Sequence, residues 1–461
     1  MPTWVPYPDF VNPGDNAWQL TAATLVGLMS VPGLAVLYGG VMQKRWSVNA
    51  MMMSFVAFAL VLVVWVLYGF KMAFGAPMHI FGADTGFLST MWGTPHSVLS
   101  TASEQSQAAI PRITFGPAFN FSQPTLVYFQ FVFAAITPIL MLGSVLGRFS
   151  FRAWIPFVVL WSSIIYTVNA FLIWGGGFWS THGALDFSGG YVIHLAAGIS
   201  GFVAAAVIGP RLQRDREIDA PNNLLMVATG AGLLWLGWNG FNGGDPYYAG
   251  TDASLAVLNT NLACAVAFLS WVACDYLTGH KPSLISSVNG MITGLVAITP
   301  AAGFVNGWGA LSIGLIAGIL VYFALNYLSR VAPFRNVDDT LGVIYTHGIA
   351  GLLGGLLVGF FADPNIIVYA ATGGGATDLP GFAGIFNGGN AELLKDQAET
   401  ALWVIGFSGI GTFILLKLVG LFVPLRMEEA DMEEGDIAVH GHEVYPSDVP
   451  SLAFPAGAQS N

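Results

Sequence analysis

Charged residues are scarce in this sequence. The chain has 15 basic and 26 acidic residues among 461, so 9% of its residues are charged, against roughly 25% in soluble globular proteins. Hydrophobic residues make up 55% of the chain. A water-soluble globule of this length needs far more polar surface. The same composition excludes a disordered chain, a collagen and a nucleic-acid-binding protein as main interpretations.

Cysteine is rarer still, and acidic charge is confined to one end. Cys264 and Cys274 are the two cysteines, ten residues apart in an apolar stretch. This placement favours packing over a disulfide or a metal site. From Arg426 onward there are eight acidic residues and one basic residue, so most of the net charge of -11 belongs to this tail. The rest of the chain is nearly neutral, as expected for a protein embedded in lipid.

Long apolar runs are abundant. A helix that crosses the hydrocarbon core of a membrane needs about 20 mostly apolar residues. The sequence offers eleven such segments, with approximate limits 18–40, 49–70, 124–146, 153–174, 188–209, 222–243, 254–275, 283–301, 309–329, 341–362 and 398–423. We therefore predict an all-α integral membrane protein with eleven transmembrane helices.

Lysine and arginine predict how these helices are oriented. With the N-terminus outside, the inner loops hold eleven basic residues and the outer loops three, Lys71, Arg112 and Lys395. Basic residues favour the cytoplasmic side of a membrane. We therefore expect residues 1–17 to form an external tail, residues 18–425 the transmembrane domain, and residues 426–461 an acidic cytoplasmic tail. The expected location is the cytoplasmic membrane.

Two histidines within the spans share one pattern. Asp186 is followed after seven residues by His194, then by glycines at 198 and 201; Asp339, His347 and glycines at 351 and 354 repeat this spacing. The two segments are five spans apart and so run in opposite directions. This predicts a five-plus-five inverted repeat, about 18–209 and about 222–362, with an added eleventh helix at about 398–423. Such repeats place the functional path at their interface near the bilayer midplane.

The histidines are expected to lie near the middle of the membrane, because eight helical residues advance about 12 Å from an aspartate at the membrane face. A neutral imidazole has one donor and one acceptor nitrogen, so two of them can share a proton. Two buried histidines bonded to backbone carbonyls are the alternative. We expect Asp186 and Asp339 to have structural or electrostatic roles, with Asp186 capping a helix start.

At this point the sequence resembles the ammonium transporter (Amt/Mep/Rh) family, on the Amt/Mep side. The segment DFSGGYVIHLAAGISGFVAAAVIGPR, Asp186 to Arg211, resembles the fifth-helix signature of that family. Further landmarks occur in the same order: PGLAVLYGG at 32–40, WGGG at 174–177, HGALDF at 182–187, GWNGFNGG at 237–244, KPSLISSVNG at 281–290, TPAAG at 299–303 and THGIAG at 346–351. The resemblance covers nearly the whole chain. It implies a homotrimer of eleven-helix protomers with one pore each, no enzymatic activity, and no cofactor or metal.

The resemblance also implies roles for individual residues. His194 and His347 match the twin histidines of the pore, and Phe133 and Phe241 match its phenylalanine gate. Trp174 and Phe129 match the aromatic walls of the outer ammonium site, and Gln130 beside Phe129 also fits. Asp186 matches the family's aspartate near that site. These correspondences assign His194, His347, Phe133, Phe241, Trp174 and Phe129 to one expected path and give Asp186 a structural or electrostatic role beside it.

Asp245 is a departure from the family pattern. The family often has a serine four residues after the second gate phenylalanine, where this chain has Asp245 followed by Pro246, Tyr247 and Tyr248. A carboxylate there can attract a cation more strongly than a hydroxyl, so we assign Asp245 to the outer site. The alternative is that it faces the loop and caps or pairs with a neighbour.

The acidic tail also resembles a family segment, one that couples protomers and lies on the face that can bind a PII signalling protein. A solvated tail is the alternative. His440 and His442 alone do not make a metal site, since two ligands are too few.

These observations predict an ammonium transporter that recruits ammonium at an aromatic site, passes it through a phenylalanine gate and deprotonates it along two histidines. Aromatic faces attract ammonium by cation–π interaction, and ammonium, unlike potassium, can lose its charge. Three alternatives are a haem held by His194 and His347, an ammonium sensor, and a channel for another small neutral solute such as urea.

Overall fold

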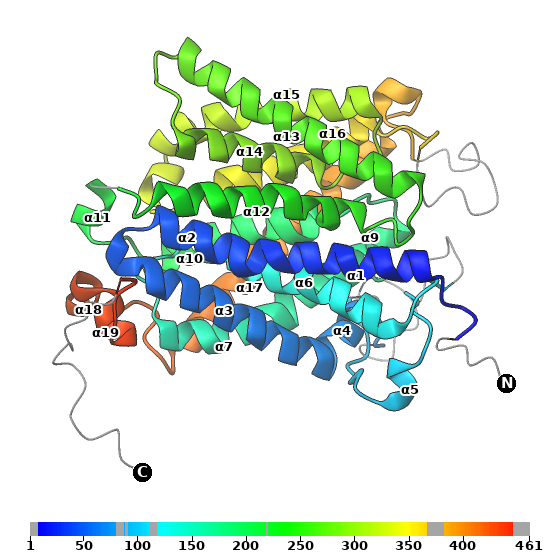
Figure 1. The fold of residues 1–461 in the computed structure, drawn as a ribbon, viewed down its shortest axis with the longest axis horizontal. Helices are drawn as coiled ribbons and strands as arrows, with labels where there is room; N and C mark the ends of the chain where they lie inside the picture. The colour runs from blue at the N-terminus through cyan, green and yellow to red at the C-terminus, as the bar shows by residue number, and fades with distance from the viewer. Residues whose placement is uncertain are drawn as a thin grey trace.

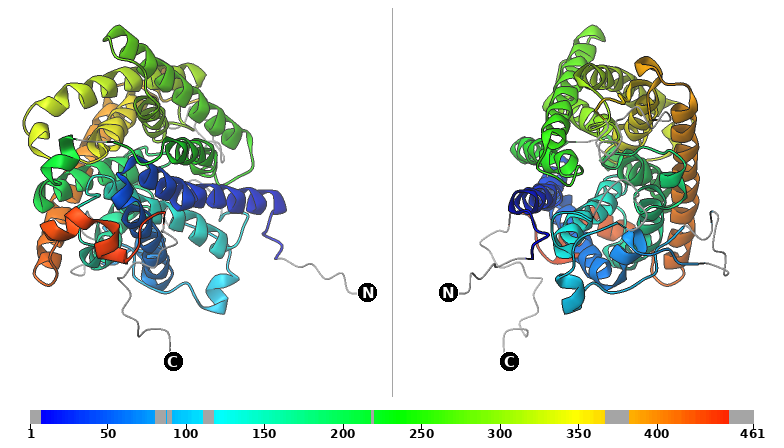
Figure 2. Two further views of the ribbon diagram at one scale, coloured as in Figure 1. Left: turned by 60° about the vertical axis from the view of Figure 1, so that its left-hand side comes forward. Right: turned by 90° about the vertical axis from the view of Figure 1, so that its right-hand side faces the viewer.

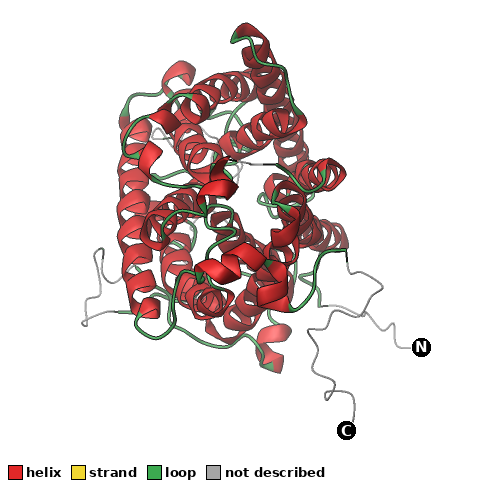
Figure 3. Ribbon diagram, turned by 90° about the vertical axis from the view of Figure 1, so that its left-hand side faces the viewer, coloured by secondary structure: helices red, strands yellow, loops and turns green. Residues whose placement is uncertain are grey.

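The computed structural model describes residues 8–79, 87, 91–110, 118–217, 220–366 and 382–445. In these residues the only regular elements are helices, and all but a few short ones run side by side in one bundle (Figures 1 and 3). Figure 2 shows the same bundle from two further directions. This confirms the all-helical prediction.

Each of the eleven predicted spans coincides with a helical segment. Several segments contain a π-helical turn, which divides the span into two or three labelled parts. The first six spans are α1 (Pro13–Leu28) with η1 (Met29–Leu34) and α2 (Ala35–Val41); α3 (Ser47–Val64) with η3 (Trp65–Gly69) and α4 (Phe70–Phe74); α6 (Gln123–Leu142); α7 (Phe151–Trp161) with η6 (Ser162–Tyr166) and α8 (Thr167–Ile173); η7 (Gly190–Leu195) with α10 (Ala196–Ile208); and α12 (Leu224–Gly243). The remaining five are α13 (Thr251–Leu277); α14 (Leu284–Ile298); α15 (Gly307–Asn326); η10 (Ile344–Ile349) with α16 (Ala350–Phe361); and α17 (Glu392–Gly420).

Ten of the described helical segments are long and apolar enough to cross a membrane, and α14 is shorter. Its 15 residues extend about 22 Å, less than the hydrocarbon thickness of about 30 Å. The chain turns at Thr299–Phe304 instead of continuing the helix. The exact number of spans and the side on which each terminus lies therefore remain predictions.

Short elements mark the two ends of the bundle. At one end, where α1 begins, lie α5 (Thr101–Glu104) and α9 (Phe178–Thr181); at the other lie α11 (Gln213–Glu217), α18 (Glu429–Glu434) and α19 (Asp436–His440) (Figure 1). The remaining described elements are four 3₁₀ turns: η2 (Lys44–Trp46), η8 (Leu328–Arg330), η9 (Phe334–Asn336) and η13 (Ile385–Asn387). Following the predicted orientation, we name the first end the outer end and the second the inner end.

The helices begin at side-chain caps and pack closely through small residues. Asn12, Asn223 and Asn306 each accept backbone N–H groups at a helix start, as N-cap residues do. Where α13 meets α15, a Cβ on Gly314 would clash with the backbone of Ala263. Small residues at such crossings let helices approach closely in a membrane. Cys264 packs in this region, and both cysteines are buried free thiols.

The last long helix joins the two halves of the chain. In the described structure α17 packs against α7 and α10 from the first half and α16 from the second, and it runs along one side of the bundle (Figure 2). The two halves also meet each other directly, since α10 packs against η10 and α16 packs against η7. Both contacts lie at the helices that carry the paired histidines.

Candidate functional site

The two histidines meet at the centre of the bundle. His194 Nδ1 lies 3.1 Å from His347 Nδ1, within hydrogen-bonding distance, and the two rings are 26° from parallel. His194 is fully buried and His347 nearly so. A bond between two Nδ1 atoms requires one donor and one acceptor, so the rings hold opposite tautomers when both are neutral. The pair can therefore share and transfer one proton.

Glycine allows the two rings to come this close. A Cβ on Gly198 would clash with the backbone of Gly348, and a Cβ on Gly351 would lie 2.6 Å from the Gly190 carbonyl oxygen and 3.1 Å from the His194 Cβ. Each of the two repeated glycines thus lies where the two helices cross. The glycine four residues after each histidine was visible in the sequence, and the structure gives it a packing role.

This geometry excludes the haem alternative. Metal–imidazole bonds are about 2 Å long, so an iron between the two rings would hold its ligand nitrogens about 4 Å apart. The Nδ1 atoms are 3.1 Å apart and the rings stack at a centroid distance of 5.3 Å. No space remains between them for a flat macrocycle.

Both repeated aspartates cap the helices that carry the histidines. The Asp186 carboxylate accepts four backbone N–H groups, from Gly189, Gly190, Tyr191 and Val192, at 2.6–3.2 Å. Burial raises the pKa of Asp186 to about 6, and the four N–H bonds oppose this rise. Asp339 Oδ2 accepts the Ile344 N–H at 2.8 Å.

Two phenylalanines stack above the histidines on the outer side. The rings of Phe133 on α6 and Phe241 on α12 lie 4.4 Å apart, and both are buried. Phe241 in turn stacks on His194, with ring centroids 5.8 Å apart. Phe133, Phe241, His194 and His347 therefore form one continuous file of rings.

Trp238 is a member of this file that the sequence analysis missed. Its ring stacks on His194 at 5.4 Å, 18° from parallel, and its Nε1 donates to Thr299 Oγ1. Trp238 precedes Phe241 by three residues on α12, so the two side chains share a helix face. That spacing in GWNGFNGG was a signal that could have identified it.

The predicted outer residues surround the outer end of this file. Phe129 packs on Phe133 at 4.8 Å, and Trp174 stands edge-on to Phe133 at 6.4 Å. The indole N–H of Trp174 donates to the Asp186 carbonyl oxygen at 2.7 Å, which fixes the ring. Tyr247 completes the wall: its hydroxyl accepts from Gln130 Nε2 at 2.8 Å, and its φ of 62° is unusual for a residue with a side chain.

Asp245 is buried beside this wall and does not face the outer loop. It is 5% exposed, and the hydroxyls of Ser188 and Tyr247 stabilise its charged form. Burial and the nearby Asp186 raise the pKa of Asp245. The Ser188 hydroxyl lies 2.8 Å from the Phe241 carbonyl oxygen, so its single O–H donates either to that carbonyl or to Asp245.

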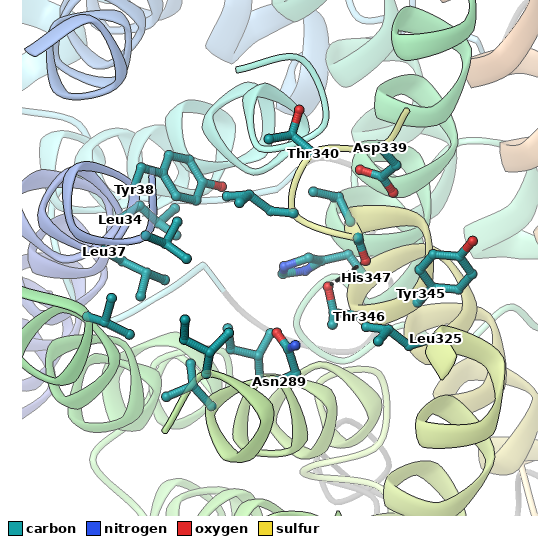
Figure 4. Close-up of a pocket in the computed structure, with 18 residues that line it drawn as sticks. Leu34, Leu37, Tyr38, Asn289, Leu325, Asp339, Thr340, Tyr345, Thr346 and His347 are labelled. Atoms are coloured by element: carbon teal, nitrogen blue, oxygen red, sulfur yellow. Dashed lines mark hydrogen bonds between the residues drawn. The ribbon is translucent and has the colours of Figure 1, made fainter. Parts of the chain in front are cut away.

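A cavity of about 370 Å³ opens on the inner side of His347 (Figure 4). Most of its wall is apolar, and its polar groups come from Tyr38, Asn289, Asp339, Thr340 and Thr346. The His347 ring extends into this space (Figure 4). The file of rings thus leads from the outer aromatic wall to an inner cavity.

The described part of the acidic tail is folded against the inner end of the bundle. Asp436 is fully buried and its carboxylate accepts the N–H groups of Val48 and Asn49, each at 2.8 Å. His440 Nε2 lies 3.0 Å from Asn49 Oδ1. The alternative of a solvated tail is therefore wrong for residues 426–445, because a buried carboxylate caps α3. Residues 446–461 lie outside the described structure.

Comparison with known proteins identifies the family to which this chain belongs. The model of the Ammonium Transporter Family matches residues 17–445. Ammonium transporter 2 of Arabidopsis thaliana is 47% identical over 95% of this chain and 89% of its own length. Ammonium transporter 3 member 2 of Oryza sativa subsp. japonica is also 47% identical, over 95% of this chain and 90% of its own.

Solved structures with a similar fold support the same family. Mep2 of Saccharomyces cerevisiae superimposes with a TM-score of 0.75 at 27% identity, over 92% of this chain and 89% of that one. Mep2 of Candida albicans gives a TM-score of 0.75 at 27% identity, over 91% and 88%. The chain belongs to the Ammonium Transporter Family and is a multi-pass membrane transporter, not an enzyme.

Proposed function

We propose that this protein carries ammonium across the cytoplasmic membrane by binding it at the outer aromatic wall, removing its proton and passing ammonia along the two histidines. One observation carries the proposal: a hydrogen-bonded pair of buried imidazoles lies directly below two stacked phenylalanines. This arrangement provides proton-exchanging groups in a path whose other walls are mostly apolar.

The outer wall can hold a cation before it enters. Trp174 and Phe129 contact the Phe133 ring, and Tyr247 stands edge-on to Phe129. A cation over an aromatic face gains about 0.5–2 kcal/mol. Asp245 adds a carboxylate beside the same wall. Together these groups favour a small cation at this position.

The stacked phenylalanines then oppose the passage of the charged form. Placing a cation at the bilayer centre costs several kcal/mol, and Phe133 and Phe241 offer no oxygen to replace its water. Ammonium can leave its proton behind and continue as ammonia, whereas potassium cannot. The bonded imidazoles accept and donate hydrogen bonds to ammonia and can pass the proton separately.

The same proposal includes the arrangement of the whole protein in the membrane. We propose eleven spans, an external N-terminus and a cytoplasmic C-terminus, because α11 with its basic residues and the tail helices α18 and α19 share one end of the bundle (Figure 1). The two halves, about 18–209 and about 222–362, form the inverted repeat. Resemblance to the family supports a homotrimer and a PII protein as a partner at the inner face.

The proposed function can be tested by measuring ammonium currents and solute uptake with the protein in proteoliposomes. Ammonium pulses on a solid-supported membrane are expected to give inward currents, with uptake of methylammonium and none of urea. His194→Ala and His347→Ala are each expected to reduce ammonium flux below about a tenth of wild type, because the proton-exchanging pair is lost, or to admit potassium.

His182→Ala is the matched control, because His182 is an exposed histidine at the outer end. It is expected to behave as wild type. Wild-type flux and selectivity in both pore variants would refute the role of the pair. Binding of ammonium without flux would support the sensor alternative, and urea flux would support a neutral-solute channel.

A further inference from the structure

Two stretches of the outer loop before α6, residues 105–110 and 118–122, pair with each other. The Phe119 N–H donates to the Ala108 carbonyl oxygen at 2.8 Å, and the Ala108 N–H donates to the Phe121 carbonyl oxygen at 2.9 Å. Gln107 Nε2 donates to the Phe119 carbonyl oxygen at 3.0 Å. Hydrogen bonds on both sides therefore fix the backbone that carries Phe119.

Asp15, in the first turn of α1, joins this loop to the segment that follows α12. Asp15 Oδ2 accepts a hydrogen bond from Asn120 Nδ2 at 3.1 Å, and Asp15 Oδ1 accepts one from the Ala249 N–H at 2.9 Å. The Asn12 N–H also donates to the Asn120 carbonyl oxygen at 2.8 Å. Asp15 is buried, so water competes little for its bonds. The two loops are therefore held side by side.

Phe119 packs on the ring of Tyr247. Their ring centroids lie 4.5 Å apart and the planes are 30° from parallel, while Phe129 meets Tyr247 edge-on at 6.0 Å. Tyr247 has a φ of 62°, a left-handed conformation that is unfavourable for a bulky residue and persists only where surrounding contacts hold it. Phe119 supplies one of these contacts from a distant segment of the chain.

The Tyr247 hydroxyl connects this packing to the carboxylate of Asp245. Gln130 Nε2 donates to the Tyr247 oxygen at 2.8 Å, so the one O–H of the hydroxyl is available to Asp245. This hydroxyl stabilises the charged form of the carboxylate. A Tyr247 ring that turned away would take the donor with it. The position of the ring therefore affects the negative charge beside the aromatic wall.

We propose that Phe119 is a positioning residue of the outer ammonium site, contributed by the outer loop. Stacked on Tyr247, it keeps the Tyr247 hydroxyl against Asp245, and the charged carboxylate strengthens the binding of a small cation at the aromatic wall. Phe119 thereby sets the affinity for ammonium and leaves passage along the histidine pair unaffected. The inference rests on the proposed function and gives the outer loop a role in it.

Phe119→Ala removes the stacked ring and leaves the backbone bonds of the loop in place. The half-saturating ammonium concentration is expected to rise about 2- to 10-fold, as for the loss of one aromatic stacking interaction, with little change in maximal current. Phe119→Tyr keeps the ring and is expected to restore the wild-type value. The measurement is ammonium current against concentration, with the full chain in proteoliposomes. If Phe119→Ala does not fold, Phe119→Leu gives the same readout, because leucine fills space but cannot stack.

Two further variants show whether Phe119 acts through Asp245. In an Asp245→Ser background, Phe119→Ala is expected to add little further shift, because groups in one network are not additive. Phe386→Ala is the matched control, since Phe386 is an aromatic residue of η13 that is 65% exposed, and it should leave the curve unchanged.

Three outcomes would overturn the role of Phe119. They are an unshifted half-saturating concentration, a loss of maximal current without such a shift, and an equal shift with and without the Asp245 carboxylate. Absence of current in the wild-type protein would instead overturn the proposed function.

Discussion

At the scale of single residues, the buried carboxylate of Asp245 distinguishes the outer site of this chain. It lies four residues after Phe241 and two residues beyond the end of α12, and the hydroxyls of Ser188 and Tyr247 stabilise its charged form. A hydroxyl at this position would offer hydrogen bonds without charge. Burial raises the pKa of Asp245, and a cation bound at the aromatic wall opposes this rise because it favours the charged carboxylate.

Asp245→Ser is expected to weaken recruitment of ammonium. Loss of the carboxylate beside the aromatic wall should raise the half-saturating ammonium concentration about 3- to 30-fold, with little change in maximal current. The measurement is current against ammonium concentration. Asp252→Ser, at the more exposed start of α13, is the control and should leave the curve unchanged. An unshifted curve for Asp245→Ser would remove this carboxylate from the cation site.

At the scale of elements, the crossing of η7–α10 with η10–α16 holds the histidine pair together. The hydrogen bond between the rings depends on backbones that touch where Gly198 meets Gly348 and where Gly351 meets Gly190. Helix packing thereby sets the distance of 3.1 Å between the Nδ1 atoms of His194 and His347.

Gly198→Ala is expected to separate the two helices. The added Cβ would clash with the Gly348 backbone, and backbone cannot move aside as a flexible side chain can. Overpacking of this kind costs about 1–3 kcal/mol, so thermal stability in detergent and ammonium flux should both fall. Gly232→Ala on α12 has no atom within 4 Å of the new Cβ and should be neutral or slightly stabilising. Equal behaviour of the two variants would contradict the proposed role of the crossing.

Much of the path could be predicted from the sequence because membrane helices have strong signals. Each predicted span coincides with a helical segment, and the repeated spacing around His194 and His347 predicted that two distant segments meet. Trp238 was missed because most aromatic residues in such a chain face lipid or core.

At the scale of the whole molecule, the inner end couples distant parts of the chain. The tail contacts α3 through Asp436, and the Met427 N–H donates to the Arg148 carbonyl oxygen at 3.0 Å. The guanidinium of the buried Arg148 in turn bonds to Thr340 and to the Asp338 carbonyl oxygen, beside the inner cavity. A continuous set of contacts therefore connects the tail with the cavity wall.

Asp436→Ala is expected to loosen the tail without unfolding the bundle. The change leaves the Val48 and Asn49 N–H groups without their acceptor, and loss of such a cap costs about 1–2 kcal/mol, enough to expose the tail about tenfold more often. Limited proteolysis, read by mass spectrometry, should cut Met427–Tyr445 faster in this variant, while the melting temperature of the bundle changes little. Asp431→Ala, which alters an exposed acidic residue of α18, should be cut at the wild-type rate. Equal cleavage in all three proteins would mean that the Lys44–Glu443 ion pair, at 2.8 Å, and the buried Met432 hold the tail without the cap.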